Sequence, residues 1–185
     1  MGMQIPSVDA QDINLYIGGR PELLEPDFAK FAGIGPEEGA VIGLLQRVSQ
    51  AEVRVGGEAV GAIGRGLLVL IGVQRDDTEA RAQRLLERLL GYRVFEDPAG
   101  RMNLSLQETR GGLLLVPQFT LAADTRKGRR PSFSSAASPQ QAERLFGHLL
   151  TLARAQHGDV HSGRFGADMQ VALVNDGPVT FWLES

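Results

Sequence analysis

The sequence predicts a mixed α/β domain in which strands outnumber helices. About nine short segments are apolar, or alternate between apolar and polar residues, as strands do. Two longer segments repeat apolar residues at helical spacing and predict two amphipathic helices. Several strand candidates follow one another across glycine-containing turns. This order favours hairpins and a mixed sheet over a doubly wound parallel sheet.

The first strands are expected soon after the fortieth residue. Residues 41–48 (VIGLLQRV) form an apolar run that is typical of a buried strand. Residues 52–63 contain two alternating halves around Gly56 and Gly57, and a glycine pair tolerates the positive φ of a tight hairpin turn. Residues 67–73 (LLVLIGV) are continuously apolar, as expected of a central strand that is covered on both faces.

Two segments carry the start signals of helices. Residues 79–90 follow the N-cap oxygens of residues 76–78 and place their apolar side chains on one stripe. The second helix is expected after Ser138, because Pro139 at the first position and Gln141 close behind are typical of a helix start. Its apolar stripe consists of Ala142, Leu145, Phe146, Leu149, Leu150 and Ala153.

The remaining strands are expected over residues 92–95, 113–121, 160–165, 169–174 and 179–183. The last two flank the tetrapeptide Asn-Asp-Gly-Pro, which taken alone predicts an ordinary hairpin turn.

The first forty residues differ in composition from the rest of the chain. They hold four of the nine prolines, and seven acidic and two basic residues give them a net charge of −5. Residues 41–185 carry 17 basic and 15 acidic residues, a net charge of +2. We interpret residues 1–40 as an irregular, acidic, proline-containing extension and residues 41–185 as the functional domain. The extension is either specific to a lineage or absent when translation begins at Val41.

The composition excludes several kinds of chemistry. The chain has no cysteine, which removes disulfides, thiolate nucleophiles and cysteine-based zinc sites. No apolar run reaches the about 20 residues that span a bilayer, and no secretory signal pattern is present, so we expect a cytoplasmic protein without a membrane partner. His157 and His161 have a spacing seen in zinc sites, but no third ligand stands near them. We therefore expect no metal and no cofactor.

Two neighbouring segments favour contact with a phosphate-bearing substrate. The loop of residues 124–131 (DTRKGRRP) concentrates four bases, which are either solvated or in contact with phosphate: Arg126, Lys127, Arg129 and Arg130. Residues 118–120 place polar groups at a strand end immediately before that loop. The carboxylates of Asp124, Asp168 and Asp176 are candidate general bases that the sequence alone does not bring together.

Eight segments, in order, resemble those of the D-aminoacyl-tRNA deacylases, a family of proofreading hydrolases. The resemblance covers the whole of residues 41–185, and its most specific parts are QFTL, GRFGADM and NDGPVTFWL. The matching segments are residues 45–48, 61–73, 92–95, 102–105, 118–125, 127–133, 163–169 and 175–183.

The resemblance implies a homodimer with layered, barrel-like sheets and an active site at the subunit interface. Two family motifs build that site. The first contains Gln118 and Thr120, but Pro117 stands where the family usually has a serine, so a serine hydroxyl has no role here. The second is a Gly-cis-Pro pair, matched by Gly177 and Pro178, which in the family reaches into the partner's site and binds substrate.

The resemblance also implies a mechanism without cofactor or metal. An aminoacyl ester is already activated, so hydrolysis mainly needs a positioned water and donors for the developing oxyanion. The main-chain N–H groups of Phe119 and Thr120 are the expected donors, with assistance from the 2′-hydroxyl of the terminal ribose. A nucleophilic Thr120 is the alternative, and it lacks an evident general base.

Selectivity is expected to come from exclusion of L-aminoacyl groups. The carbonyls of a cis Gly177-Pro178 pair would clash with an L side chain and accept a hydrogen bond from the substrate amine. Glycine has no side chain to exclude, so mischarged glycyl-tRNA is an expected second substrate. The basic residues of the 124–131 loop are then expected to contact tRNA.

Two other functions remain open at this point. A nucleic-acid-binding module without catalysis would use the same basic loop, but a domain with a net charge of +2 is weakly basic for stable phosphate binding. A hydrolase of small D-amino esters would act without the body of tRNA. Deacylation assays with D- and L-charged tRNA distinguish these functions.

Overall fold

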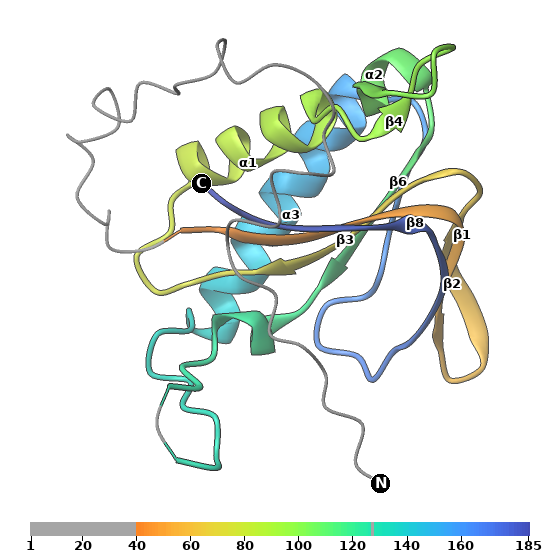
Figure 1. The fold of residues 1–185 in the computed structure, drawn as a ribbon. Helices are drawn as coiled ribbons and strands as arrows, with labels where there is room; N and C mark the ends of the chain where they lie inside the picture. The colour runs from red at the N-terminus through yellow and green to blue at the C-terminus, as the bar shows by residue number, and fades with distance from the viewer. Residues whose placement is uncertain (1–39, 127) are drawn as a thin grey trace, which may run out of the picture. The chain divides into compact units, whose positions relative to one another are not determined.

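The computed structural model describes residues 40–126 and 128–185, so the expected extension lies, apart from Ala40, outside the described residues. Figure 1 shows the path of the chain. The elements in order are β1 (Ile42–Val55), β2 (Glu58–Ile63), β3 (Gly66–Gly72), α1 (Glu79–Gly91), β4 (Phe95–Glu96), β5 (Met102–Leu104), α2 (Leu106–Thr109), β6 (Gly112–Pro117), η3 (Phe119–Ala122), α3 (Pro139–Gln156), β7 (Val160–Ser162) and β8 (Gln170–Glu184).

A six-stranded sheet organises the described part of the chain. Its strand order is β2-β1-β3-β6-β7, and β8 pairs with β1. The long strand β1 is antiparallel to β2, β3 and β8, whereas β3, β6 and β7 run parallel to one another. The sheet curls until β2 approaches β7: a Cβ added at Gly61 would lie 2.8 Å from the Ser162 carbonyl oxygen. The result is a mixed α/β fold with a nearly closed, barrel-like sheet.

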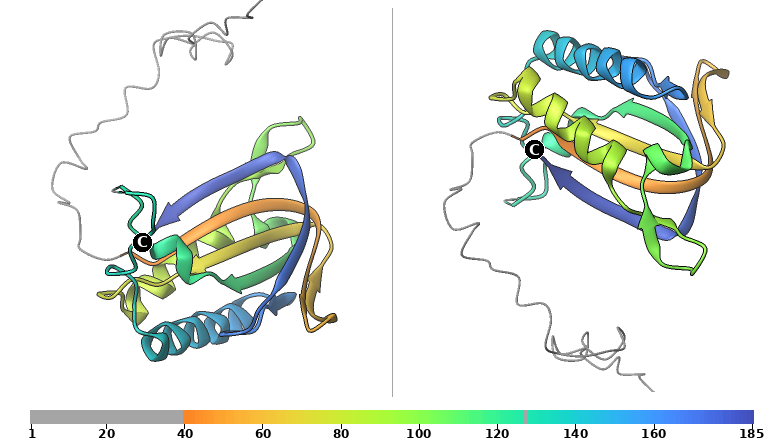
Figure 2. Two further views of the ribbon diagram at one scale, coloured as in Figure 1. Left: turned by 90° about the horizontal axis from the view of Figure 1, so that it is seen from below. Right: turned by 90° about the horizontal axis from the view of Figure 1, so that it is seen from above.

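Two apolar clusters lie on the two faces of the curled sheet. Figure 2 shows α1 and α3 side by side across one face, with β8 on the far side from α3. The larger cluster lies between these helices and the sheet and includes Leu67, Leu115 and Phe95. The smaller one fills the inside of the curl around Val53, Leu68 and Leu114 and is closed by partly buried side chains of the 169–173 segment.

Both predicted helices are confirmed. Thr78 caps α1, whose buried side chains are Ala82, Leu85, Leu86, Leu89 and Leu90, as its apolar stripe predicts. The Ser138 hydroxyl accepts a hydrogen bond from the Gln141 N–H, and Pro139 occupies the first turn of α3. All residues of the predicted α3 stripe are buried except Leu150, which is partly buried.

Five predictions of local structure need correction. The strand expected over residues 92–95 begins only at Phe95, as β4. The Asn-Asp-Gly-Pro tetrapeptide is no hairpin turn, because β8 continues through it as one strand paired with β1. The strand expected over residues 113–121 ends at Pro117 and gives way to the 3-10 helix η3. The strand expected at 160–165 stops at Ser162. The sequence predicts two helices, whereas the structure contains a third, the short helix α2, which begins with a capping box at Ser105.

No helix in the described part of the chain is long and apolar enough to cross a membrane.

Candidate active site

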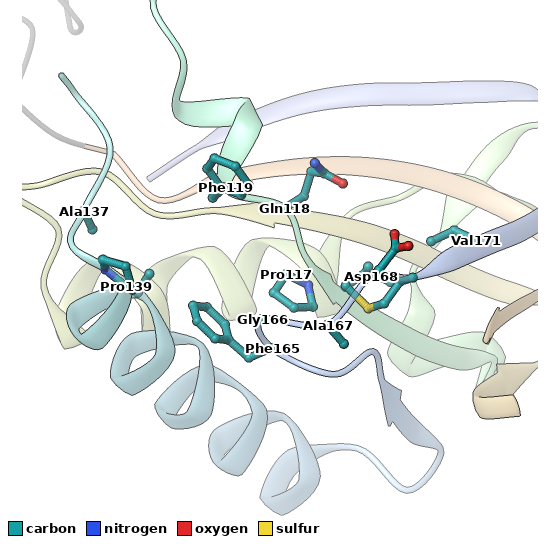
Figure 3. Close-up of a pocket in the computed structure, with 13 residues that line it drawn as sticks. Pro117, Gln118, Phe119, Ala137, Pro139, Phe165, Gly166, Ala167, Asp168 and Val171 are labelled. Atoms are coloured by element: carbon teal, nitrogen blue, oxygen red, sulfur yellow. The ribbon is translucent and has the colours of Figure 1, made fainter. Parts of the chain in front are cut away.

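A cavity of about 530 Å³ opens where the end of β6, the start of α3 and the 165–171 segment meet. This volume lies in the range typical of small-ligand sites, about 300–1,000 Å³. Figure 3 shows Phe165 and Pro139 on the α3 side and Gln118 and Asp168 as polar groups of the wall. Its lining is otherwise largely apolar and includes Val116, Pro117, Phe119, Ala137, Ala142, Met169 and Val171.

The first turn of η3, which begins at the cavity wall, contains two main-chain N–H groups without a partner in the described part of the chain. Gln118 is the N-cap, and the first hydrogen bond of the turn runs from the Leu121 N–H to the Gln118 carbonyl at 3.2 Å. The N–H groups of Phe119 and Thr120 precede that bond, as at any helix start, and neither is hydrogen-bonded within the described residues. Both residues are exposed. Two adjacent N–H groups are therefore available to an oxyanion.

The Thr120 hydroxyl is not activated as a nucleophile. Its Oγ1 accepts a hydrogen bond of 2.5 Å from the Gln118 amide Nε2, which is a donor and no base. No carboxylate or imidazole within the described residues is hydrogen-bonded to this hydroxyl. The described residues thus place no general base at the Thr120 hydroxyl.

Two small or rigid residues determine where η3 lies. Pro117 ends β6 beside Ile71 of β3, and the next N–H, that of Gln118, still donates to the Ile71 carbonyl at 2.7 Å. Gly72 lets η3 approach β3, because a Cβ at this position would lie 2.8 Å from the Leu121 Cβ. Pro117 thus contributes the end of the strand and a cavity wall, with no hydroxyl.

The three candidate general bases differ in their surroundings. Hydrogen bonds from the Arg126 guanidinium and N–H lower the pKa of Asp124, so this carboxylate is a poor base. Asp176 pairs with Arg47 at 3.4 Å. Asp168 is the one that lines the cavity.

Gly177 and Pro178 lie in a bulge of β8. The register runs from the pair Val48–Asn175 to the pair Gln46–Thr180, so residues 176–179 face only Arg47 of β1. The Gly177-Pro178 peptide bond is cis, and both residues are exposed. Gly177 has a φ of +134°, where glycine is strongly favoured.

The buried side chain of Arg47 holds the bulge in place through hydrogen bonds to main-chain carbonyls. Its side chain is 6% exposed, and its Nε donates to the Asp176 carbonyl at 2.9 Å. Its Nη1 donates to the Val94 carbonyl at 2.6 Å. The Asn175 side chain adds two bonds, accepting from the Val179 N–H at 2.7 Å and donating to the Thr180 hydroxyl at 2.8 Å.

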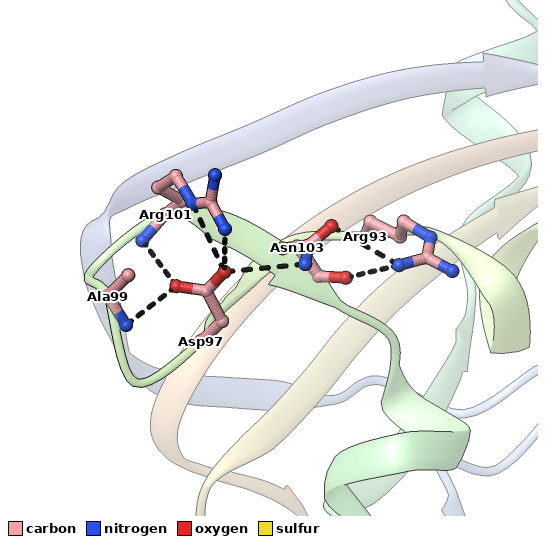
Figure 4. Close-up of polar contacts among 5 residues, drawn as sticks. All are labelled: Arg93, Asp97, Ala99, Arg101 and Asn103. Atoms are coloured by element: carbon pink, nitrogen blue, oxygen red, sulfur yellow. Dashed lines mark hydrogen bonds and ion pairs between the residues drawn. The ribbon is translucent and has the colours of Figure 1, made fainter.

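The hairpin of β4 and β5 supports the Val94 end of this chain of contacts. Asp97 accepts hydrogen bonds from the N–H groups of Ala99 and Arg101 and from the side chains of Arg101 and Asn103 (Figure 4). These bonds, chiefly that from the Arg101 N–H, lower the pKa of Asp97. Arg93, which directly precedes Val94, donates to the Asn103 carbonyl of β5 at 2.7 Å. This bond ties the segment of Val94 to the hairpin.

The basic loop follows η3 directly. Asp124 and Ser132 exchange two main-chain hydrogen bonds of 2.7 and 3.0 Å that close the loop. Arg126 is neutralised by Asp124 at 2.8 Å. Arg129 and Arg130 are exposed and make no ion pair within the described residues, whereas Lys127 lies outside them.

The two histidines with zinc-like spacing have separate partners. His157 Nε2 lies 2.6 Å from the Gly111 carbonyl oxygen, and His161 Nε2 lies 3.0 Å from the Asp159 carboxylate. The described residues contain no group of three side chains suited to a metal ion.

The structure thus brings together only part of the predicted site. Gln118 and Phe119 line the cavity, and Thr120 follows them in η3. Gly177 and Pro178 are not among the lining residues of the same chain's cavity. The sequence analysis missed Arg47 and Asn175, although an arginine within the apolar run VIGLLQRV is the signal of a buried charge with a specific partner.

Comparisons with known proteins identify the family of this chain. A family model described as D-Tyr-tRNA(Tyr) deacylase matches residues 44–184. A D-aminoacyl-tRNA deacylase of Thioalkalivibrio sulfidiphilus is 71% identical over 144 residues, which are 78% of this chain and 97% of that protein. The corresponding protein of Alkalilimnicola ehrlichii is 68% identical over 145 residues, again 78% and 97% of the two chains.

A solved structure named c-Myc DNA Unwinding Element Binding Protein shares the fold. Its TM-score is 0.75 at 40% identity, and the match covers 78% of this chain and 98% of that one. The family match spans most of the chain and both relatives are covered almost completely, so this chain belongs to the D-aminoacyl-tRNA deacylase family, whose members are ester hydrolases.

Proposed function

We propose that this chain removes D-amino acids from tRNA as a chiral proofreading enzyme and that it also clears mischarged glycyl-tRNA. The observation that carries the proposal is the pair of unpaired N–H groups at Phe119 and Thr120 beside a largely apolar cavity. A water molecule attacks the acyl carbon, the ester bond to the ribose 3′-oxygen breaks, and that oxygen takes the proton. The two N–H groups stabilise the oxyanion that forms in between, and the substrate's 2′-hydroxyl assists the transfer.

The discrimination against L-amino acids comes from Gly177 and Pro178 of a second copy of the chain. These residues are exposed and do not line the cavity of their own chain, which is consistent with use by a partner. In a homodimer the carbonyls of this pair would fill the space of an L side chain and accept a hydrogen bond from the substrate amine. Glycine has no side chain to be excluded.

Two features of β8 support the homodimer. Within the described residues β8 pairs only with β1, so its other edge is free to pair with another chain. The same strand exposes Val174 and Trp182, each 49% accessible. Exposed apolar residues on a free strand are typical of an interface.

The basic loop supplies contacts to the tRNA backbone. Arg129 and Arg130 are its free cations within the described residues, Lys127 adds a charge, and Arg126 is held by Asp124. So few phosphate contacts suit transient binding of a substrate that is then released. A substrate used in translation places the protein in the cytoplasm.

A second candidate function is nucleic-acid binding without catalysis. It is favoured by the basic loop and by the name of the c-Myc DNA Unwinding Element Binding Protein, the solved structure with 40% identity. A hydrolase of small D-amino esters would need only the cavity, so it predicts equal rates on D-Tyr-adenosine and D-Tyr-tRNA.

Deacylation of D-Tyr-tRNA, L-Tyr-tRNA and glycyl-tRNA by the purified protein tests the proposal. We expect rapid release of D-Tyr and glycine and a rate on L-Tyr-tRNA lower by at least about a hundredfold, because one excluded side chain blocks binding. Gly177→Ala should lower the ratio of the D-Tyr-tRNA rate to the L-Tyr-tRNA rate, because an added Cβ would lie 2.6 Å from Val179 Cγ2 and distort the bulge. Binding of tRNA without turnover would favour the second candidate.

A further inference from the structure

Two phenylalanine rings are exposed together beside the cavity. Phe119 is 60% and Phe133 is 41% accessible. Their ring centroids are 5.2 Å apart with the planes tilted by 43°. Phenylalanine is mostly buried in folded proteins, and large exposed aromatic surface commonly marks a binding site.

The chain holds Phe133 in this place with several main-chain contacts. The Asp124–Ser132 pair closes the basic loop one residue before Phe133. The Ser135 hydroxyl donates to the Ala122 carbonyl of η3 at 2.6 Å, and the Arg75 N–H donates to the Ser135 carbonyl at 3.0 Å. Phe133 thus lies on a segment that is docked on both β3's end and η3.

Positive charge precedes Phe133 in the sequence. Arg129 and Arg130 belong to the basic loop that the Asp124–Ser132 pair closes, and both are exposed and make no ion pair within the described residues. Aromatic faces for bases combined with cations for phosphates are the means by which proteins bind single-stranded nucleic acid.

We propose that Phe119 and Phe133 form a stacking platform for the base that precedes the terminal nucleoside of the substrate's unpaired 3′ end. The inference rests on the proposed function, because the ester must reach the N–H groups of Phe119 and Thr120. The terminal nucleoside then occupies the mouth of the cavity. Phe133 is not a lining residue of the cavity, and its ring centroid lies 5.2 Å from that of Phe119, which does line it. The next base along the strand is the group that reaches it.

The test compares two substitutions of the wild type. Phe133→Leu removes the aromatic ring, whereas Phe133→Trp keeps one. Stacking of one base contributes enough to raise KM for D-Tyr-tRNA about tenfold in Phe133→Leu. We expect kcat to stay within about twofold, because the donors and the cavity are unchanged. Phe133→Trp should keep the wild-type KM. Met102→Ala removes another exposed side chain, 55% accessible and on β5, and serves as the matched control.

Shorter substrates locate the stacked base. D-Tyr-adenosine lacks the preceding base, so Phe133→Leu should leave its KM unchanged, whereas D-Tyr-cytidyl-adenosine should show the full loss. An equal loss on D-Tyr-adenosine would place the terminal base on Phe133 and overturn the assignment. An unchanged KM on D-Tyr-tRNA would also overturn it. A change of oligomeric state in Phe133→Leu that accounts for the KM effect would assign the ring to a protein interface instead.

A binding measurement separates this inference from the proposed function. Affinities for uncharged tRNA and for tRNA that lacks its last three nucleotides are measured for the wild type and Phe133→Leu. The platform predicts that truncation weakens binding to the wild type about tenfold and to the variant far less, a coupling between the two changes. Wild-type protein that binds in this way but hydrolyses no D-Tyr-tRNA would contradict the proposed function alone. Equal effects of truncation on both proteins would contradict the platform alone.

Discussion

At the scale of single residues, the site depends on main-chain groups that side chains position. Thr120 offers its N–H, while its hydroxyl is occupied by the Gln118 amide. Arg47 is not among the residues that line the cavity, yet two of its nitrogens hold the Asp176 carbonyl of the bulge and the Val94 carbonyl before β4. Side-chain motifs alone therefore describe this chemistry poorly.

The oxyanion donors can be separated from the threonine hydroxyl by substitution. Thr120→Val keeps the N–H and removes the hydroxyl, so we expect kcat for D-Tyr-tRNA to stay within about fivefold of the wild type. Phe119→Pro removes one N–H at a helix position that tolerates proline, and kcat should fall by about a hundredfold or more. Phe119→Ala, which keeps the N–H, is the control for loss of the ring. If Thr120→Val abolished hydrolysis in a single turnover, Thr120 would act as the nucleophile after all.

Arg47→Met should impair discrimination more than hydrolysis. The substitution keeps the length of the buried side chain but leaves the Val94 and Asp176 carbonyls without their donors. We expect the free energy of unfolding to fall by about 2 kcal/mol. The ratio of D-Tyr to L-Tyr release should fall at least about tenfold as the bulge reorients. Arg54→Met, on the exposed part of the same strand, should change neither quantity, and an unchanged ratio in Arg47→Met would remove Arg47 from selectivity.

At the scale of elements, the sequence predicts regular pieces well and their irregular junctions poorly. The stripes of α1 and α3 are long and periodic, and they were sufficient to predict both helices and their buried residues. The end of β6 at Pro117 and the turn of η3 depend on contacts with β3, which no local pattern encodes. The β8 bulge was interpreted as a hairpin turn because its tetrapeptide has turn composition, whereas pairing with β1 keeps both sides in one strand.

The contact between β3 and η3 can be tested at Gly72. An added Cβ would lie 2.8 Å from the Leu121 Cβ and 3.4 Å from the Gln118 carbonyl oxygen, so Gly72→Ala must displace η3 by a few tenths of an ångström. We expect kcat to fall about tenfold, with a loss of about 1 kcal/mol in the free energy of unfolding. Gly147→Ala in α3 meets nothing within 4 Å and is the matched control. Unchanged kcat in Gly72→Ala would show that η3 needs no such fit.

At the scale of the whole molecule, one buried carboxyl makes stability depend on pH. Burial raises the pKa of Asp77 to about 6, against a hydrogen bond from the Gln74 N–H that lowers it. Its Oδ1 accepts no hydrogen bond within the described residues. The folded state therefore holds this proton more tightly than the unfolded state, where the pKa is 3.8. Asp77 should reduce stability as the pH rises from about 4 to about 6.

Asp77→Asn isolates this contribution. The difference in unfolding free energy between variant and wild type should change by about 2 kcal/mol between pH 4 and pH 7, in favour of the variant at the higher pH. Urea denaturation at several pH values measures it. Glu143→Gln, at an exposed position of α3, should show no such change. A difference that is constant with pH would mean that Asp77 is ionised at no cost.

The sequence suggests candidate site residues, but it does not determine how they assemble into a site. Gln118, Phe119 and Thr120 lie together because they are consecutive. Gly177 and Pro178 lie far along the chain and outside this cavity, so a composite site requires a second chain. No pattern within one sequence determines how two copies meet.

A mixed dimer tests this composite site most directly. Phe119→Pro disables the donors and Gly177→Val disables the bulge, and the two variants are co-expressed with different affinity tags. If each site combines the cavity of one chain with Gly177 of the other, the mixed dimer contains one intact site and one doubly impaired site. The mixed dimer should then hydrolyse D-Tyr-tRNA at about half the wild-type rate and keep the wild-type preference for D-Tyr-tRNA over L-Tyr-tRNA, whereas the Phe119→Pro homodimer is at least about a hundredfold slower and the Gly177→Val homodimer loses the preference. A mixed dimer with the reduced preference of the Gly177→Val homodimer would show that each chain completes its own site and would contradict the account.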